Sequence, residues 1–208
     1  MTTRDTQAGR ARHEVVRAGE ADIEVLAQVI AEAFFPLAVC RWLIPDGPAC
    51  RAAFPAYFRL YVEHATADGI VETTPGRDVA ALWIPGDGPA EPPDNYKEQL
   101  AAITGPHLER FLAFDQQLDR RHPAGDFHEH LAILAVRPDR QGQGTGTALL
   151  DARHADLEDQ GIPAYLEASD ERTRRIYLAH GYTDRDGGPI GLAPGICMYP
   201  MWRQPRTQ

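Results

Sequence analysis

The chain has 208 residues, a formal net charge of −9 and an isoelectric point near 5.3. Phosphate backbones are bound by clustered Lys and Arg, so this acidic composition argues against a nucleic-acid-binding protein. No apolar run approaches the ~20 residues that span a bilayer, which argues against a membrane protein. Three cysteines, a small and odd number, are typical of a reducing compartment, and we expect a cytoplasmic protein.

The length fits one domain of moderate size. We expect a disordered lead over residues 1–12, which carry no apolar segment of the kind found in secretory signals, and a single domain over residues 13–208.

The N-terminal half predicts a strand, two helices and a hairpin. Residues 20–35 carry apolar side chains at helical spacing, with Ile23, Leu26 and Ile30 on one face, and Pro36 ends this helix. A Pro75-Gly76-Arg77 turn separates the two strands of the hairpin. The predicted elements are residues 14–18, 20–35, 46–67, 70–74 and 78–84.

Residues 85–127 form a connection longer than neighbouring strands usually need. Two helical patterns lie within it, residues 96–103 and 107–118, separated by Gly105-Pro106. The block is too short to bury a core of its own. We therefore expect a helical insertion before the fourth strand, near the substrate side of the domain.

The most informative stretch of the sequence is residues 130–150. Residues 130–136 are apolar on both faces, which predicts a buried strand, and Pro138 ends it. Glycines then occur at every second position, and a helical pattern begins after them. A strand, a glycine-rich turn and a helix start together direct backbone N–H groups toward an anion.

Several interpretations of these glycines are open at this point. A dinucleotide fold needs Gly-x-Gly-x-x-Gly directly after the strand, whereas here the spacing is Gly142-x-Gly144-x-Gly146 and Arg137-Pro138-Asp139-Arg140 intervenes. A P-loop needs a lysine that the segment lacks. A connector without any ligand is the remaining alternative.

The last third predicts a strand, a helix and a final strand. Residues 163–169 are mostly apolar but include Glu167. Asp170 is suited to be the N-cap of the next helix, Tyr177 lies on one face of it, and Gly181 ends it. Residues 195–202 predict the last strand.

Two segments resemble the GNAT N-acetyltransferases. Gln141-Gly142-Gln143-Gly144-Thr145-Gly146 is similar to the family's acetyl-coenzyme A signature, Gln/Arg-x-x-Gly-x-Gly/Ala. Residues 170–182 are similar to a second family segment, Asn-x-x-Ala-x-x-x-Tyr-x-x-x-Gly-Phe, with Asp170 in place of Asn and Thr173 in place of Ala. The segments Leu-x-Val-x-Pro-x-x-Gln-Gly-x-Gly-x-Gly and Tyr-Leu-Glu-Ala-Ser look most like the subgroup of puromycin acetyltransferases.

The resemblance implies an α/β (α+β) GNAT fold, a mixed central sheet of six to seven strands flanked by helices. It implies an acyltransferase that moves an acetyl group from acetyl-CoA to a primary amine of a small molecule, by direct attack in a ternary complex. Two alternatives stay open: a protein or peptide N-acetyltransferase, and a non-catalytic CoA-binding sensor module. We expect neither a nucleic-acid nor a membrane partner, and a homodimer is compatible with the sequence.

The resemblance also assigns the cofactor-binding residues. Backbone N–H groups of the glycine turn would hold the pyrophosphate, and the strand before it would pair with the pantetheine arm. The predicted set is Leu134, Val136, Gln141, Gly142, Gln143, Gly144, Thr145, Gly146 and Asp170.

Three residues are candidates for catalysis. Tyr177 matches the family's general acid, since a phenol of pKa about 10 can protonate a thiolate of pKa about 8.5; the alternative is a core tyrosine. His130 is the candidate base because the pKa range of histidine suits the removal of a proton from an amine. The alternative is a solvated residue at a strand end. Glu167, isolated in an apolar strand, is either a base, an amine anchor or the partner of an arginine.

His128 and His130 lie two residues apart and share one face of the strand, with Glu129 on the other. A metal pair is a weaker interpretation, because no third ligand is spaced beside them and acetyl transfer needs no metal. We therefore predict no metal site.

Overall fold

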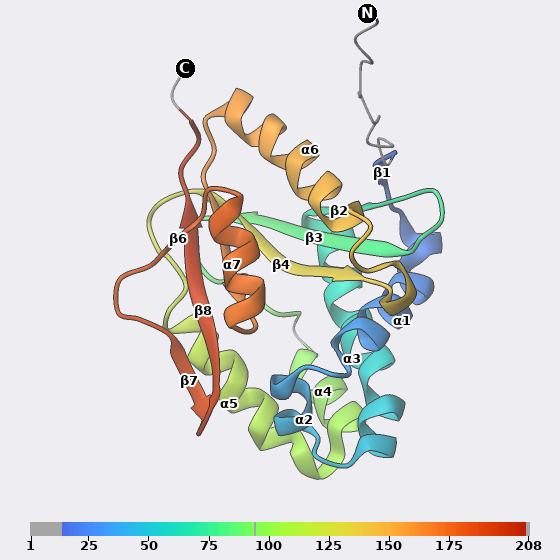
Figure 1. Ribbon diagram of the computed structural model, residues 1–208. Helices are drawn as coiled ribbons and strands as arrows, with labels where there is room; N and C mark the ends of the chain where they lie inside the picture. Colours follow the sequence, from blue (N-terminus) through green and yellow to red (C-terminus); the bar gives the residue numbers. More distant parts are fainter. Residues whose placement is uncertain (1–13, 94, 207–208) are drawn as a thin grey trace, which may run out of the picture.

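The computed structural model describes residues 14–93 and 95–206 (Figure 1). The expected lead at residues 1–12 lies outside this part of the chain. The helices are α1 Ile23–Phe34, α2 Ala38–Leu43, α3 Gly47–Asp68, α4 Tyr96–Thr104, α5 Leu108–Asp119, α6 Thr145–Gln160 and α7 Glu171–Ala179. The strands are β1 Val16–Arg17, β2 Ile70–Thr73, β3 Val79–Gly86, β4 His128–Val136, β5 Ala164–Ala168, β6 Thr183–Asp184, β7 Ile190–Ala193 and β8 Ile196–Arg203.

A mixed sheet forms the centre of the domain, as predicted. Its strand order is β1-β2-β3-β4-β5-β8-β6, with β7 paired to β8, and only the β4–β5 contact is parallel. The described strands number eight rather than the predicted six or seven. The sequence did not indicate β6 and β7 because each is short and neither alternates apolar with polar residues.

Helices cover both faces of this sheet. Helices α1 and α3 pack on β3 and β4 from one side, whereas α6 and α7 pack on the other, above β3, β4, β5 and β8 (Figure 1). The helices α4 and α5 between β3 and β4 lie beyond one end of the sheet, where α4 contacts α3 and α5 contacts β7. In residues 14–93 and 95–206, no helix is both long and apolar enough to cross a membrane.

The parallel strands β4 and β5 diverge along their length. Cα partners exist only at their first residues, Glu129 with Ala164 and His130 with Tyr165, although β4 continues to Val136. Both strands therefore present unpaired edges to the space between them.

A β-bulge at Ala132 changes the register of β4. Leu82 of β3 is opposite Ile133, whereas the next residue, Trp83, is opposite Leu131. The extra residue shifts the alternation, so that Leu131 packs into the core beneath α6 and Ile133 into the core beneath α1 and α3.

Candidate active site

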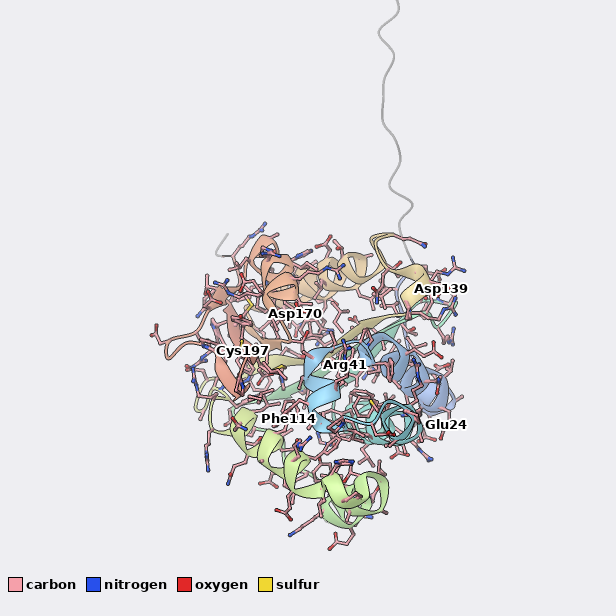
Figure 2. The ribbon with its side chains drawn as sticks, turned by 60° about the horizontal axis from the view of Figure 1, so that its bottom comes forward. Glu24, Arg41, Phe114, Asp139, Asp170 and Cys197 are labelled. Atoms are coloured by element: carbon pink, nitrogen blue, oxygen red, sulfur yellow. The ribbon has the colours of Figure 1, made fainter. Side chains whose placement is uncertain are left out.

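A cavity of 590 Å³ opens where β4 and β5 separate. It extends from the turn that precedes α6, past α7, to an apolar wall formed by α1, α2, α3 and α5. Figure 2 views the domain from the side of α2 and α5 and labels Arg41 on α2, Phe114 on α5 and Asp170 before α7. The apolar wall includes Phe34, Leu37, Cys40, Leu43, Phe58 and Phe114.

The second half of β4 offers its backbone to this cavity. The N–H of Arg137 donates to the carbonyl of Asp78, toward β3, at 2.8 Å. Because alternate residues of a strand direct their polar groups to opposite edges, Leu134 and Val136 direct theirs toward the open side. The side-chain amide of Gln141 donates to the carbonyl of Val136 on that side at 3.1 Å.

The glycine turn presents a helix N-terminus to the same cavity. Gly142 and Gly144 have φ of 76° and 86°, in the left-handed region where other residues are strained. Gly144 is the N-cap of α6, and no side chain caps the helix. The first N–H groups of α6 are thus available to an anion, favoured also by the helix dipole.

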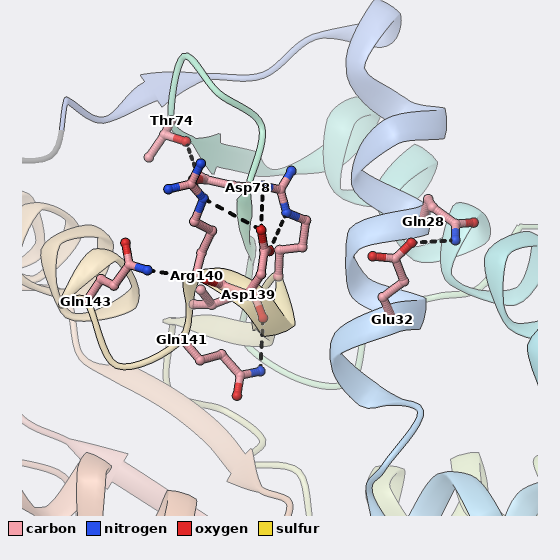
Figure 3. Close-up of polar contacts among 10 residues, drawn as sticks. Gln28, Glu32, Thr74, Asp78, Asp139, Arg140, Gln141 and Gln143 are labelled. Carbon is pink, nitrogen blue, oxygen red and sulfur yellow. Dashed lines mark hydrogen bonds and ion pairs between the residues drawn. The ribbon is translucent and has the colours of Figure 1, made fainter.

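Side chains hold the turn in place (Figure 3). The amide of Gln143 donates to the carbonyl of Asp139 at 3.3 Å, and Arg140 lies 3.8 Å from the carboxylate of Asp78. At Gly146 an added Cβ would lie only 3.1 Å from a methyl of Val136, so the glycine lets α6 pack closely against β4. These contacts fix the turn without occupying the α6 N-terminus.

Asp170, directly before α7, and Tyr177, on α7, both line the cavity. The Asp170 carboxylate accepts from the N–H of Thr173 at 2.7 Å, which confirms it as the N-cap. The ring of Tyr177 packs edge-on to that of Tyr182, 5.7 Å away. Burial raises the pKa of Tyr177 well above its usual value, so its hydroxyl keeps its proton at neutral pH.

His130 and Glu167 form a pair at the inner end of the cavity, where the strands still meet. His130 Nε2 lies 2.9 Å from Glu167 Oε2, and the Glu167 side chain is only 5% exposed. Burial acts to raise the pKa of Glu167, but the charge and hydrogen bond of His130 lower it below its usual value. Glu167 thus pairs with a histidine rather than with an arginine.

The pair fixes the tautomer of the imidazole. An ionised carboxylate only accepts hydrogen bonds, so the proton of neutral His130 resides on Nε2. The other ring nitrogen, Nδ1, then carries the lone pair and can accept a proton. An orienting carboxylate plays the same part in histidine-based catalytic triads.

Two further histidines lie against this pair. His128 Nδ1 donates to the carbonyl of Asp126 at 2.7 Å, and its Nε2 lies 3.0 Å from His122 Nε2. Burial lowers the pKa of both, that of His122 to about 3, so both rings are neutral at pH 7. The ring of His122 is 4.8 Å from that of His130. His122 could not be singled out from the sequence, since it lies in a loop outside any periodic pattern.

Hydroxyl groups also reach the cavity, from α3. Tyr57 and Tyr61 have their hydroxyls 2.9 Å apart and both line it. Behind them the hydroxyl of Tyr96 donates to Asp115 at 2.9 Å, and burial raises the pKa of Asp115 to about 6. Both tyrosines lie in the helix predicted over residues 46–67, but its pattern did not indicate that they face a cavity.

Comparisons with known proteins identify this arrangement. Residues 111–184 match the family model of the acetyltransferase (GNAT) domain. The chain is similar to the histone acetyltransferase HPA2 and related acetyltransferase from Corynebacterium glutamicum, with 25% identity, 95% of this chain and 98% of that one covered, and a TM-score of 0.70.

Two other solved structures share the fold at lower identity. Arylalkylamine N-acetyltransferase 2 from Aedes aegypti is 14% identical, with 93% and 99% coverage and a TM-score of 0.58. The PaiA N-acetyltransferase from Thermoplasma acidophilum, solved with coenzyme A, is 11% identical, with 92% and 98% coverage and a TM-score of 0.52.

The fold and the domain match define an acyltransferase. Residues 111–184, from α5 to β6, match the model of the GNAT acetyltransferase domain, and the acyl donor of that class is acetyl-CoA. The predicted fold, enzyme class and cofactor are thereby confirmed. The open β4 edge, the uncapped α6 N-terminus and the glycines of its turn suit such a cofactor.

Proposed function

We propose that the protein transfers an acetyl group to a primary amine of a small molecule, by direct attack within a ternary complex. The observation that carries this proposal is the His130–Glu167 pair at the inner end of the cavity. A buried carboxylate that orients a histidine is the equipment of a general base, for which a passive CoA-binding module has no use.

The shape of the cavity supports the cofactor-binding residues proposed from the resemblance. The N–H groups of Thr145 and Gly146, with the turn from Gln141 to Gly144, would hold the pyrophosphate. Backbone groups of Leu134 and Val136 would bond the pantetheine arm along the open edge, and Asp170 would border it. When bound, acetyl-CoA supplies the thioester whose acyl group is transferred.

The side chains then divide the proton transfers. Nδ1 of His130 accepts the proton that the amine loses as it attacks, and the carboxylate of Glu167 stabilises the resulting imidazolium. The Tyr177 hydroxyl holds a proton for the sulfur that departs. Exclusion of water by the bound substrates would strengthen each of these electrostatic interactions.

The wall opposite the cofactor turn favours a small acceptor. Helices α1, α2, α3 and α5 surround that part of the cavity with aromatic and aliphatic side chains, and the hydroxyls of Tyr57 and Tyr61 add polar contacts. An acceptor with an apolar or aromatic body beside its amine is complementary to this lining. The resemblance to puromycin acetyltransferases and the arylalkylamine acetyltransferase neighbour agree with that class.

An amine panel tests the proposal. Release of free CoA thiol would be followed with aminonucleosides, arylalkylamines, aminoglycosides, polyamines and short peptides. We expect turnover with a small amine that carries an apolar group, lost in His130→Gln. Turnover with peptides alone would favour the protein acetyltransferase alternative, and acetyl-CoA binding without any turnover would favour the sensor module.

The free state of Cys40, Cys50 and Cys197 agrees with work in the reducing cytoplasm.

A further inference from the structure

Three potential metal ligands converge at the inner end of the cavity. His122 from the loop after α5, His130 from β4 and Glu167 from β5 each offer one donor atom, and these atoms lie within 4.8 Å of one another. We propose that they form a binding site for a zinc ion, which switches off acetyl transfer. The sequence showed only the His128-x-His130 pair; the fold supplies two ligands that are distant along the chain.

The hydrogen bonds around His122 leave it a lone pair for a metal. A backbone carbonyl only accepts, so His128 Nδ1 carries the proton that it donates to Asp126. Nε2 of neutral His128 therefore accepts, and Nε2 of His122 donates to it across 3.0 Å. Nδ1 of His122 is left without a proton. Histidine zinc ligands are typically held by such a bond from their other nitrogen.

Glu167 is the second observation that indicates a cation. Its Oε1 atom is buried and accepts no hydrogen bond of ordinary length from any described group, although the neighbouring Tyr165 hydroxyl acts on this carboxylate and helps to lower its pKa. Among residues 14–93 and 95–206 no lysine or arginine pairs with this carboxylate. A buried oxygen with spare acceptor capacity is costly unless something compensates it, and a bound cation would do so.

The chemistry and spacing of the three donors suit zinc. Two imidazoles and one carboxylate are the ligand set of several zinc enzymes, with a fourth position left open. A tetrahedral ion with bonds of about 2.0–2.1 Å holds its ligands about 3.3 Å apart. His130 and Glu167 lie at 2.9 Å already, and His122, on a loop, has to approach by up to about 1.5 Å.

Zinc at this site would remove the base, a consequence that depends on the proposed function. The ion replaces the proton on His130 Nε2, and a neutral imidazole then carries its proton on Nδ1. That nitrogen loses the lone pair that accepts the proton of the amine. Glu167 coordinates the metal instead of orienting the ring. Zinc should therefore lower kcat without displacing acetyl-CoA.

The test measures zinc binding separately from turnover. The full chain is freed of metal and titrated with zinc chloride by calorimetry and by competition with a chromophoric chelator. We expect one equivalent to bind, and His122→Gln to weaken binding at least 100-fold while retaining acetyl transfer, since its amide can still donate to His128. His64→Gln is the matched control, because His64 also lies beside a carboxylate, 3.4 Å from Asp68, but the described part of the chain places no third ligand there.

The outcomes separate the two proposals. Zinc that inhibits the native enzyme, spares acetyl-CoA binding and fails to inhibit a folded His122→Gln variant supports the site. Absence of binding, or equal binding by both histidine variants, overturns it. If no amine is acetylated, the proposed function fails, but the titration still decides whether the metal site exists. A melting curve without metal confirms that each variant is folded.

Discussion

Replacing Glu167 by Gln isolates the charge of the buried carboxylate. Glutamine keeps the shape of the side chain and an oxygen that can accept a hydrogen bond from His130 Nε2. In the native protein this nitrogen lies 2.9 Å from the Glu167 carboxylate. What it removes is the negative charge that stabilises the imidazolium formed during transfer. Two unit charges about 4 Å apart attract by about 4 kcal/mol at an effective dielectric constant of about 20.

This energy sets the expected loss of activity. Since about 1.4 kcal/mol corresponds to a factor of ten, the full interaction is worth about a thousandfold in kcat/KM for the amine. Part of it is recovered by the amide dipole, so we expect a loss of 100- to 1,000-fold. The KM for acetyl-CoA should remain within about twofold, because the glycine turn is untouched.

The assay is steady-state release of CoA thiol with the best amine of the panel. Glu72→Gln is the control: Glu72 is also a buried carboxylate, 9% exposed, but it lies on β2 and does not line the cavity. It should retain activity. A loss of less than fivefold in folded Glu167→Gln, or a loss confined to the KM for acetyl-CoA, would refute the role given to the pair.

Three other variants test the rest of the site and the fold. Tyr177→Phe should reduce kcat about 100-fold, with unchanged acetyl-CoA affinity by calorimetry; full activity would remove the residue from the mechanism. Gly144→Ala should weaken acetyl-CoA binding at least tenfold and lower stability by ~1–2 kcal/mol, because Gly144 has a positive φ. Gly188, at a similar φ of 71° and also in open space, is the control: Gly188→Ala should lower stability by the same amount and leave acetyl-CoA binding unchanged. His154 is buried and bonded to Tyr182, and burial lowers its pKa to about 3. The folded state therefore resists protonation that the unfolded state accepts below about pH 6.5, and stability should fall by about 1.4 kcal/mol per pH unit as pH drops from 6.5 toward 3. Urea titrations should show His154→Gln gaining about 2 kcal/mol relative to the native protein between pH 7.5 and pH 5; parallel curves would contradict this.

Local patterns made the cofactor half of the site predictable. The strand, the glycines with φ > 0 and the helix start are adjacent in sequence, so the turn around Gly142 and Gly144 could be anticipated from residues 130–150 alone. Asp170 as an N-cap was predicted in the same way. The position of Glu129 opposite His130 also followed from strand alternation, and its carboxylate bonds Arg153 of α6 at 2.7 Å on the far face.

The acceptor half depends on contacts between distant segments. The pairing of His130 with Glu167 joins residues 37 apart, and His122 reaches them from a loop whose path follows from the packing of α5 against β7. No period in the sequence encodes such a meeting. The β-bulge is hidden for a related reason, because residues 130–136 are apolar on both faces and tolerate either register.

The bulge at Ala132 makes β4 two segments of opposite phase. In the first segment, the N–H of Glu129 donates to the carbonyl of Pro163, so the backbone polar groups of odd-numbered residues point toward β5. In the second, even-numbered residues, Leu134 and Val136, turn their backbone toward the cavity. Deletion of Ala132 would make Leu131 and Ile133 consecutive opposite Trp83 and Leu82, so both segments could keep their pairing with β3. The common pairing with β3, and not the extra residue, thus keeps the base in step with the strand edge on which the acyl donor would lie.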